Sequence, residues 1–386
     1  MDRPGRLIEI IIPGFIAILV SIIAHDPGFL GQYTDYMTIY FRDPGRVLNG
    51  LPYVDYEFEY TPPIALIWLL ASRAALLASQ IGIDPFLAIS RTVFSINVLF
   101  YILYIYAIYR ISRISSSPYP PLALAILSPS IAYYLYYNWD IIASSLMVSG
   151  IYMLTRRRIH ISAVLIGLGA SIKIFPGVAL IATSLAMKCV EIRKRISFLL
   201  LGVMIAGSPY VLLWLLYSPG VEYIIRYHSN WYCENCFYVL FTDDIFDSAL
   251  RTVSSIAMIA IPLIYVVSYL SRHGDLNRGA QAILGASLSP VALSISLSYV
   301  YSPQMNIMIS PLYIVLRGRA IALLLAQDIL NTLIMILWFH ENTIASAIGI
   351  ESRGPWHRES PIQWIAFLRI LLLWIVSLFI LRDSRP

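Results

Sequence analysis

The chain has 386 residues, of which 59% are hydrophobic and only 13% are charged, and its formal net charge is +5. A soluble domain could not cover so much apolar side chain, and a mean hydropathy of +0.73 is typical of a protein whose solvent is lipid. The apolar runs are continuous, whereas a membrane barrel would show alternating segments. Basic residues occur in short patches between the runs, a pattern that reports membrane topology and argues against nucleic-acid binding. We therefore expect one all-α, polytopic membrane domain over residues 1–386.

In chain order, the apolar runs predict about 11 to 13 transmembrane helices, some of them short or broken. The first run, Leu7 to Ala24, has no small-residue cleavage site after it, so we expect it to remain as the first helix. The basic patches place both termini in the cytoplasm, which requires an even number of crossings. The predicted helices lie near 7–24, 91–109, 120–137, 140–155, 160–173, 176–187, 196–217, 250–271, 280–299, 304–316, 320–338 and 362–381.

The segment from Thr61 to Gln80 leaves the number of membrane crossings undetermined. It is apolar but carries Arg73, so it is either a re-entrant hairpin or a full crossing. Other runs are interrupted by proline or glycine, at Ser128-Pro129, Phe175-Pro176-Gly177 and Ser302-Pro303-Gln304. Broken helices are tolerated at membrane depth where they line a cavity.

Three outer loops are predicted, at residues 25–61, 218–249 and 339–361. The first is the largest, and between Gly31 and Pro63 it is crowded with acids and tyrosines. These are Asp35, Asp43, Asp55, Glu57 and Glu59, with Tyr33, Tyr36, Tyr40, Tyr53, Tyr56 and Tyr60. An ordinary connection needs only a few polar turn residues. A long loop of this composition predicts a polar active site at a membrane surface.

Asp35, which follows the first helix, is the candidate general base. A carboxylate there takes a proton from an attacking hydroxyl if it lies within hydrogen-bond reach, although a plain turn aspartate is the alternative. Glu59 and Tyr60 belong to a run of acids and rings that suits a sugar-like ligand. An interfacial aromatic belt explains the tyrosines of this run, but not the acids among them.

Two further motifs lie at predicted helix ends. Asn138 and Asp140 flank Trp139 where one helix ends outside and the next begins, and either polar residue also suits a helix N-cap. Lys173 lies beside the break at Pro176. A lysine in this position either snorkels to the interface or holds a phosphate.

Four other residues are further candidates for substrate binding. Arg226 and His228 in the second loop could bind a phosphate or an acceptor hydroxyl, although such residues are commonly just solvated. Gln304 follows a helix break, where it either contacts substrate or caps freed backbone groups. Arg369 lies within the last helix, and an intramembrane arginine is expensive without a partner or a polar cavity.

The three cysteines do not predict a metal or redox centre. Cys233 and Cys236 form a C-x-x-C in the second loop, but a zinc site usually needs four ligands and a redox motif usually sits in a soluble domain. We expect a local disulfide or two unpaired thiols. Cys189 lies in a basic loop and is expected to be inert. The sequence has no P-loop, no Rossmann glycine pattern and no H-E-x-x-H motif, so nucleotide and metal binding lack support.

Taken together, these motifs resemble the polyprenyl-phosphate-sugar-dependent glycosyltransferases of the C-type membrane superfamily. The resemblance is to the α-mannosyltransferase branches that include the mycobacterial phosphatidylinositol-mannoside enzymes and the GPI-anchor mannosyltransferases. It is carried by Asp35, by the run Val47 to Tyr53, by Asp55, Phe58-Glu59-Tyr60 and Pro62-Pro63, by Asn138-Trp139-Asp140, by Gly169, Lys173 and Pro176, and by Ser302-Pro303-Gln304. The Tyr227-His228 pair lacks the arginine and the glutamate-serine that often follow it in that superfamily.

The resemblance implies an inverting transfer of a hexose, in these branches mannose. Asp35 would deprotonate the hydroxyl of a lipid or glycan acceptor, which attacks the anomeric carbon of a polyprenyl- or dolichyl-phosphate sugar. Lys173, Arg226 and Arg369 are the candidate cations for the departing phosphate. The leaving group bears no diphosphate, so the resemblance implies no cofactor and demands no tightly held metal, although a divalent ion stays open. The enzyme would lie in the cell membrane with its site on the extracytoplasmic side.

Two other readings compete with this one. A secondary transporter or a flippase of lipid-linked sugars also has broken helices and an intramembrane arginine. Such a protein should show repeated halves and mid-bilayer charges, whereas this chain places its acids in loops. A non-catalytic membrane subunit would not need a carboxylate close to basic residues. Neither the sugar, the acceptor nor the oligomeric state is determined by the sequence.

Overall fold

Helices form wherever the sequence contains a long apolar run. The computed structural model describes residues 5–115, 117–187, 190–273, 280–351 and 353–383, and these residues fold into α-helices and short 3-10 segments with no strand. Seven of the described helices are long and apolar enough to cross a membrane, which makes the chain a multi-pass membrane protein and confirms the all-α class. They are α1 (Gly5–His25), α4 (Pro62–Ser79), α5 (Pro85–Ile114), α11 (Ile192–Ser229), α12 (Ser248–His273), α14 (Arg319–Trp338) and α16 (Pro361–Asp383).

The remaining elements are shorter and fall into two groups. Six α-helices pack among the long ones or against their ends: α6 (Tyr119–Ile126), α7 (Pro129–Tyr134), α8 (Asp140–Thr155), α9 (Ile159–Ile172), α10 (Phe175–Ala186) and α13 (Ala280–Leu297). The second group lies in connections or at helix breaks: α2 (Asp35–Arg42), α3 (Pro44–Asn49), α15 (Glu341–Ala347), η1 (Phe237–Phe241), η3 (Pro303–Met308) and η4 (Ser310–Ile314).

Proline explains where several of these helices begin. It occupies the first turn of α4, α6, α7 and α10, where its missing N–H leaves no helical bond unmade. Ser128 precedes Pro129 and caps α7, because its Oγ accepts a hydrogen bond from the Ile131 N–H at 3.2 Å. The break predicted at Ser128-Pro129 therefore separates α6 from α7, so the predicted helix over 120–137 is two short helices.

Two predicted boundaries differ from those observed. The helix predicted over 196–217 continues to Ser229 across a kink at Tyr217, so residues 218–229 of the predicted second loop are helical. The helix predicted over 304–316 is a pair of 3-10 turns, η3 and η4. The segment from Thr61 to Gln80 contains α4. Cys189 and the terminal residues lie outside the described ranges.

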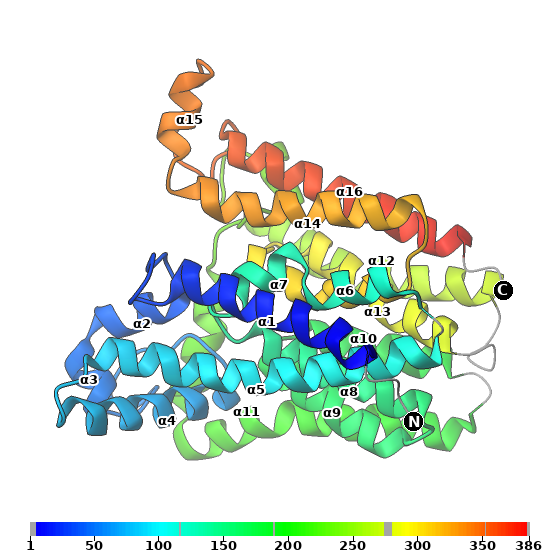
Figure 1. The fold of residues 1–386 in the computed structure, drawn as a ribbon, viewed down its shortest axis with the longest axis horizontal. Helices are drawn as coiled ribbons and strands as arrows, with labels where there is room; N and C mark the ends of the chain where they lie inside the picture. The colour runs from blue at the N-terminus through cyan, green and yellow to red at the C-terminus, as the bar shows by residue number, and fades with distance from the viewer. Residues whose placement is uncertain (1–4, 116, 188–189, 274–279, 352, 384–386) are drawn as a thin grey trace.

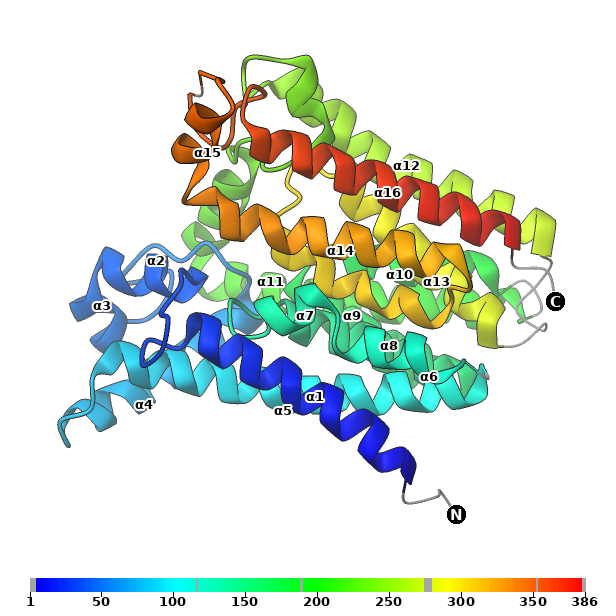
Figure 2. The same cartoon turned by 45° about the horizontal axis from the view of Figure 1, so that its top comes forward.

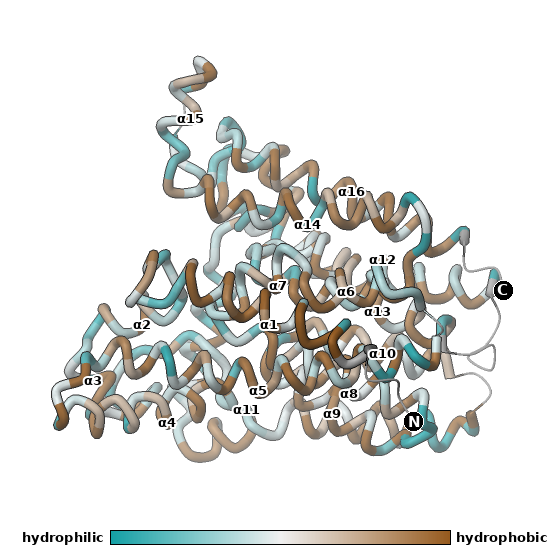
Figure 3. Tube along the Cα trace, in the orientation of Figure 1, coloured by the Kyte–Doolittle hydropathy of each residue, from teal (hydrophilic) through white to brown (hydrophobic). Residues whose placement is uncertain are grey.

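The polar connections gather at one end of the helix bundle, which we term the loop end and define as residues 26–61, 230–247 and 339–360. Both ribbon views place α2, α3 and α15 there, with α4 and the start of α5 extending past the end of α1 (Figure 1, Figure 2). Helix α1 begins, and α16 ends, at the opposite end of the bundle. Hydrophobic residues run along α1 and α16, and hydrophilic residues are concentrated near helix ends (Figure 3).

The length of the central helices determines where their polar ends lie. Helix α8 has 16 residues and α10 has 12, so they are about 24 Å and 18 Å long, whereas the 38 residues of α11 correspond to about 57 Å. Turns at the ends of the short helices are therefore enclosed by longer neighbours. The turn between α7 and α8 and the break between α9 and α10 are the two that carry the motifs.

Candidate functional site

The carboxylate of Asp35 lies against the turn that joins α7 to α8. Asp35 is the first residue of α2, and its backbone N–H donates to the Tyr137 carbonyl at 3.3 Å. Its Oδ2 accepts a hydrogen bond from Asn138 Nδ2 at 3.2 Å. The residue is only 8% exposed. The first loop is thus folded onto the turn from Tyr134 to Asp140.

That turn is fixed from behind by Asn97, a buried residue of α5. Its Nδ2 donates to the carbonyls of Leu135 at 3.0 Å and Asn138 at 2.6 Å. On its other side, Asn138 Oδ1 accepts from the Asp140 N–H at 2.9 Å. The N-cap of α8 is Trp139, so the alternative in which Asn138 or Asp140 is the N-cap is wrong. Asn97 was not a candidate in the sequence; a lone amide in an apolar helix was the available signal.

Lys173, at the break between α9 and α10, also lies against this turn. It terminates α9 in an extended backbone conformation, and its Nζ lies 3.0 Å from Oδ1 of the fully buried Asp140. Gly169 allows this approach, because a Cβ at that position would lie 3.0 Å from the Ala143 carbonyl of α8. The lysine side chain remains 18% exposed, whereas that of Asp140 is 0% exposed.

Tyr60 brings the end of the first loop to the same place. Its ring packs edge-on against Trp139 with centroids 4.5 Å apart, and its hydroxyl hydrogen-bonds the Asp35 carboxylate. We term Asp35, Tyr60, Asn138, Asp140 and Lys173 the carboxylate cluster. Each of these residues was a candidate from the sequence, and the structure brings all five together.

Burial sets the protonation of Asp35. Removal of the carboxylate from water raises its pKa to about 7, and the like charge of Asp140 acts in the same direction. Hydrogen bonds from Tyr60 and Asn138 and the positive charge of Lys173 oppose that rise. A carboxyl group with this pKa exchanges protons near neutral pH, as a general base must.

Glu59 and His228 lie beside the carboxylate cluster, but their side chains bond to residues of the first loop. Glu59 pairs with Arg42 through two hydrogen bonds of 2.9 and 3.0 Å. His228 Nε2 donates to the Glu59 carbonyl at 2.9 Å and so ties the end of α11 to the first loop. Arg226 is exposed, and its guanidinium lies 5.7 Å from the ring centre of Tyr223.

Arg369 belongs to a second polar group inside the bundle. It is 0% exposed, it donates to Asn331 Oδ1 and the Tyr301 carbonyl, and its guanidinium lies 3.6 Å from the Tyr301 ring centre. Around it lies a buried polar network formed by Ser130, Tyr301, Asn306, Gln327, Asp328, Asn331 and Arg369. Gln304, at the start of η3 beside this network, is 8% exposed.

The structure adds one acid that sequence reasoning did not select. Glu234 lies between Cys233 and Cys236, which form a disulfide, the first of the two states expected from their spacing. Burial raises the pKa of Glu234, and the charges of Lys173 and Arg369 lower it. Lys173 therefore acts electrostatically on both Glu234 and Asp35. The signal in the sequence was the placement of an acid inside a C-x-x-C.

Within the described residues, no three His, Cys, Asp or Glu side chains converge as ligands for a metal ion. No protein-family model matches the sequence, and no curated protein matches it. The function must therefore be inferred from the chemistry of the carboxylate cluster.

Proposed function

We propose that the protein is a membrane glycosyltransferase that moves a hexose, mannose in the first instance, from a polyprenyl-phosphate sugar to a lipid or glycan acceptor on the extracytoplasmic side. The observation that carries the proposal is the shared position of Asp35 and Lys173. A proton acceptor and a cation lie in one enclosed polar cluster at the end of a helix bundle that spans a lipid bilayer. That pair is what displacement of a phosphate by a hydroxyl requires.

In the proposed step, Asp35 accepts the proton of the acceptor hydroxyl. The hydroxyl oxygen forms a bond to the anomeric carbon as the bond from that carbon to the phosphate oxygen breaks, and the electron pair leaves with the phosphate. Lys173 stabilises the charge that develops on the phosphate. Attack from the face opposite the leaving group inverts the configuration at the anomeric carbon.

The surroundings of Asp35 support its role as a base more than as a turn residue. A turn aspartate bonds to neighbouring backbone N–H groups, as Asp43 does with the Arg46 N–H. The Asp35 side chain instead bonds to Asn138, more than a hundred residues away, and its pKa of about 7 differs from that of a solvated carboxyl. The contact with Asn138 holds the first loop on the α7–α8 turn, and the raised pKa suits Asp35 to accept a proton there.

The test uses the purified chain in liposomes with polyprenyl-phosphate mannose and a total bacterial lipid extract as the acceptor pool. We expect a lipid product heavier by one hexose and an equal release of polyprenyl phosphate, both detected by mass spectrometry. Asp35→Asn should abolish both while the protein remains folded and inserted. Asp43→Asn is the matched control, since asparagine also caps helices and Asp43 lies in the same loop. Undiminished turnover by Asp35→Asn would remove the aspartate from this role.

One observation favours the transporter alternative. Asp328 and Arg369 are ionisable residues inside helices α14 and α16, and such residues commonly mark transport pathways. Their bonds are internal, however: Asp328 accepts from Ser130 and Asn306, and Arg369 from α16 reaches Asn331. Movement of a fluorescent polyprenyl-phosphate sugar across the same liposomes, without product formation, would favour transport.

A further inference from the structure

The short loop Cys233–Cys236 is held more firmly than a surface connection requires. The Glu234 N–H donates to the Tyr299 carbonyl at 3.2 Å, and the Glu234 carbonyl accepts from the Tyr301 N–H at 2.9 Å. The Cys233 N–H donates to the Ile245 carbonyl at 2.8 Å. Both backbone polar groups of Glu234 are thus bonded to the segment between α13 and η3.

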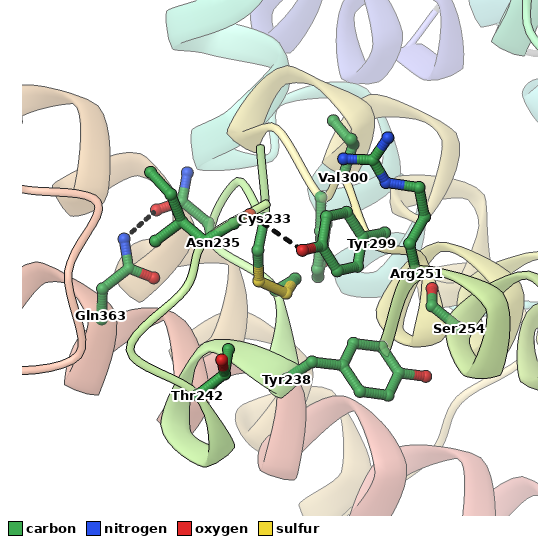
Figure 4. Close-up of a disulfide and its surroundings, with 12 residues drawn as sticks. Cys233, Asn235, Tyr238, Thr242, Arg251, Ser254, Tyr299, Val300 and Gln363 are labelled. Atoms are coloured by element: carbon green, nitrogen blue, oxygen red, sulfur yellow. Dashed lines mark hydrogen bonds between the residues drawn. A yellow bond between two sulfur atoms is a disulfide. The ribbon is translucent and has the colours of Figure 1, made fainter. Parts of the chain in front are cut away.

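A second set of contacts holds the loop from the side of α16. Arg369 Nη2 donates to the Asn235 carbonyl at 3.3 Å. Gln363 Nε2 donates to Asn235 Oδ1 at 3.3 Å (Figure 4). Cys233, Asn235 and Cys236 are buried, whereas Glu234 is partly exposed. Arg369, a candidate phosphate ligand from the sequence, contacts the backbone that carries Glu234.

The Glu234 side chain is bonded to Trp231 of the same connection. Its Oε2 accepts a hydrogen bond from Trp231 Nε1 at 2.8 Å. Its charge and that of Asp35 both act on the hydroxyl of Tyr33, whose pKa they raise together with burial. The Trp231 ring lies 5.0 Å from that of Tyr227, whose neighbour His228 bonds the Glu59 carbonyl next to Tyr60. These contacts join Glu234 to the carboxylate cluster.

The rings beside Glu234 indicate what it binds. Trp231 and Tyr232 stack with centroids 5.4 Å apart, and Tyr227 lies 5.0 Å from Trp231. A hexopyranose has an apolar face of C–H groups and a rim of hydroxyls. Aromatic faces suit the first, and a carboxylate, which only accepts hydrogen bonds, suits the second. Asp35 already supplies the base, so the second acid is not needed for proton transfer.

We propose that Glu234 binds a hydroxyl of the transferred hexose, and that the Cys233–Cys236 disulfide together with Arg369 positions it for that purpose. This inference rests on the proposed function, because the sugar it recognises is that of the polyprenyl-phosphate donor. It makes sugar recognition dependent on an oxidised disulfide, while the base and the phosphate cation lie on other elements.

The test compares donors that lack single hydroxyls. Wild-type protein is assayed with polyprenyl-phosphate mannose and with its 2-, 3-, 4- and 6-deoxy analogues, and so is Glu234→Gln. For the parent donor we expect Glu234→Gln to raise KM by about tenfold or more, the usual size of a lost charged hydrogen bond. For one deoxy analogue the variant and wild type should have the same KM, because the hydroxyl that Glu234 binds is already missing.

The disulfide is tested on the same protein. Reduction by dithiothreitol, and the double variant Cys233→Ser/Cys236→Ser, should each raise the donor KM in wild type but have no further effect in Glu234→Gln. Cys189→Ser is the control for thiol chemistry elsewhere. Thermal unfolding in detergent shows whether each variant is folded, and Glu234→Gln alone decides the matter if the double serine variant is not.

These experiments distinguish failure of the Glu234 role from failure of the proposed function. If wild-type oxidised protein transfers no hexose from any lipid donor, the proposed function fails. If it transfers mannose and Glu234→Gln discriminates among the deoxy donors as wild type does, the role of Glu234 is overturned and the transferase remains. An effect on kcat without any change in KM would also contradict a sugar-binding role.

Discussion

The ammonium of Lys173 and the carboxylate of Asp140 form an ion pair of 3.0 Å in which the aspartate is fully buried. Burial of such a pair costs desolvation energy that its attraction only partly offsets, so it is weak support for stability. Its geometry serves another purpose, because it joins the end of α9 to the start of α8. The lysine is thereby positioned beside Asp35, which it affects electrostatically.

Replacement of Lys173 should lower both the rate of transfer and the stability of the protein, for two different reasons. Lys173→Met removes the cation for the departing phosphate, and we expect kcat/KM for the polyprenyl-phosphate donor to fall by about 10² to 10³-fold, as for other single transition-state contacts. It also leaves Asp140 buried without its partner, which should destabilise the protein by about 3 kcal/mol or more. Transfer assays and thermal unfolding measure the two effects.

The double variant Lys173→Met/Asp140→Asn is the control for this prediction. It removes the unpaired charge, so thermal stability should recover substantially while transfer stays low. Recovery of activity together with stability would mean that Lys173 acts only as a structural partner of Asp140.

The pH dependence of transfer should report the ionisation of Asp35. The base works only when deprotonated, and the pKa of Asp35 is about 7. Below that value kcat/KM should rise about tenfold per pH unit, and it should level off above about pH 8. In Lys173→Met the midpoint should move to higher pH, because the positive charge that lowers the Asp35 pKa is gone. A rate that does not change between pH 5.5 and 8 would argue against Asp35 as the base.

Asn97 should be needed for activity although it lies behind the site. Its amide holds the carbonyls of Leu135 and Asn138, so Asn97→Ala leaves both without that donor and lets the turn move. We expect a loss of about 1 to 3 kcal/mol in stability and a reduced kcat at temperatures where the protein is still folded. Ser95→Ala, on an exposed face of the same helix, should change neither quantity. Full activity of folded Asn97→Ala would show that the turn between α7 and α8 keeps its conformation without the Asn97 amide.

The parts of the structure that were predictable from the sequence depend on local chemistry. The start of α8 at Asp140 and the end of α9 before Lys173 agree closely with the predicted bounds 140–155 and 160–173, because a polar turn and a helix break each show in a few consecutive residues. The grouping of Asp35, Asn138 and Lys173 was expected only through a resemblance. Nothing in their spacing places three distant segments together.

Other features depend on contacts that sequence patterns do not contain. The chain from residue 218 onward was predicted to be a loop. Helical structure instead resumes after a kink at Tyr217 and runs to Ser229 with Pro219 inside it. Asn97 and Glu234 act through the backbone of segments far away in the chain. The sequence shows that Arg369 would be costly to place inside a membrane without a partner. It does not identify the partners, which are Asn331 and the backbone of Tyr301 and Asn235.

The loop end should face the extracytoplasmic side, where a polyprenyl carrier presents its sugar. In a Cys189→Ser background, Val54→Cys places a thiol on an exposed residue of the loop end, and Arg157→Cys places one in the exposed turn between α8 and α9 at the opposite end. A membrane-impermeant maleimide should label Val54→Cys in intact cells and Arg157→Cys only after permeabilisation. The native Cys233 and Cys236 are bonded and should not react. The reverse labelling pattern would put Asp35 on the cytoplasmic side, where cytosolic nucleotide sugars would compete as donors, and the proposed lipid-borne donor would lose its main support.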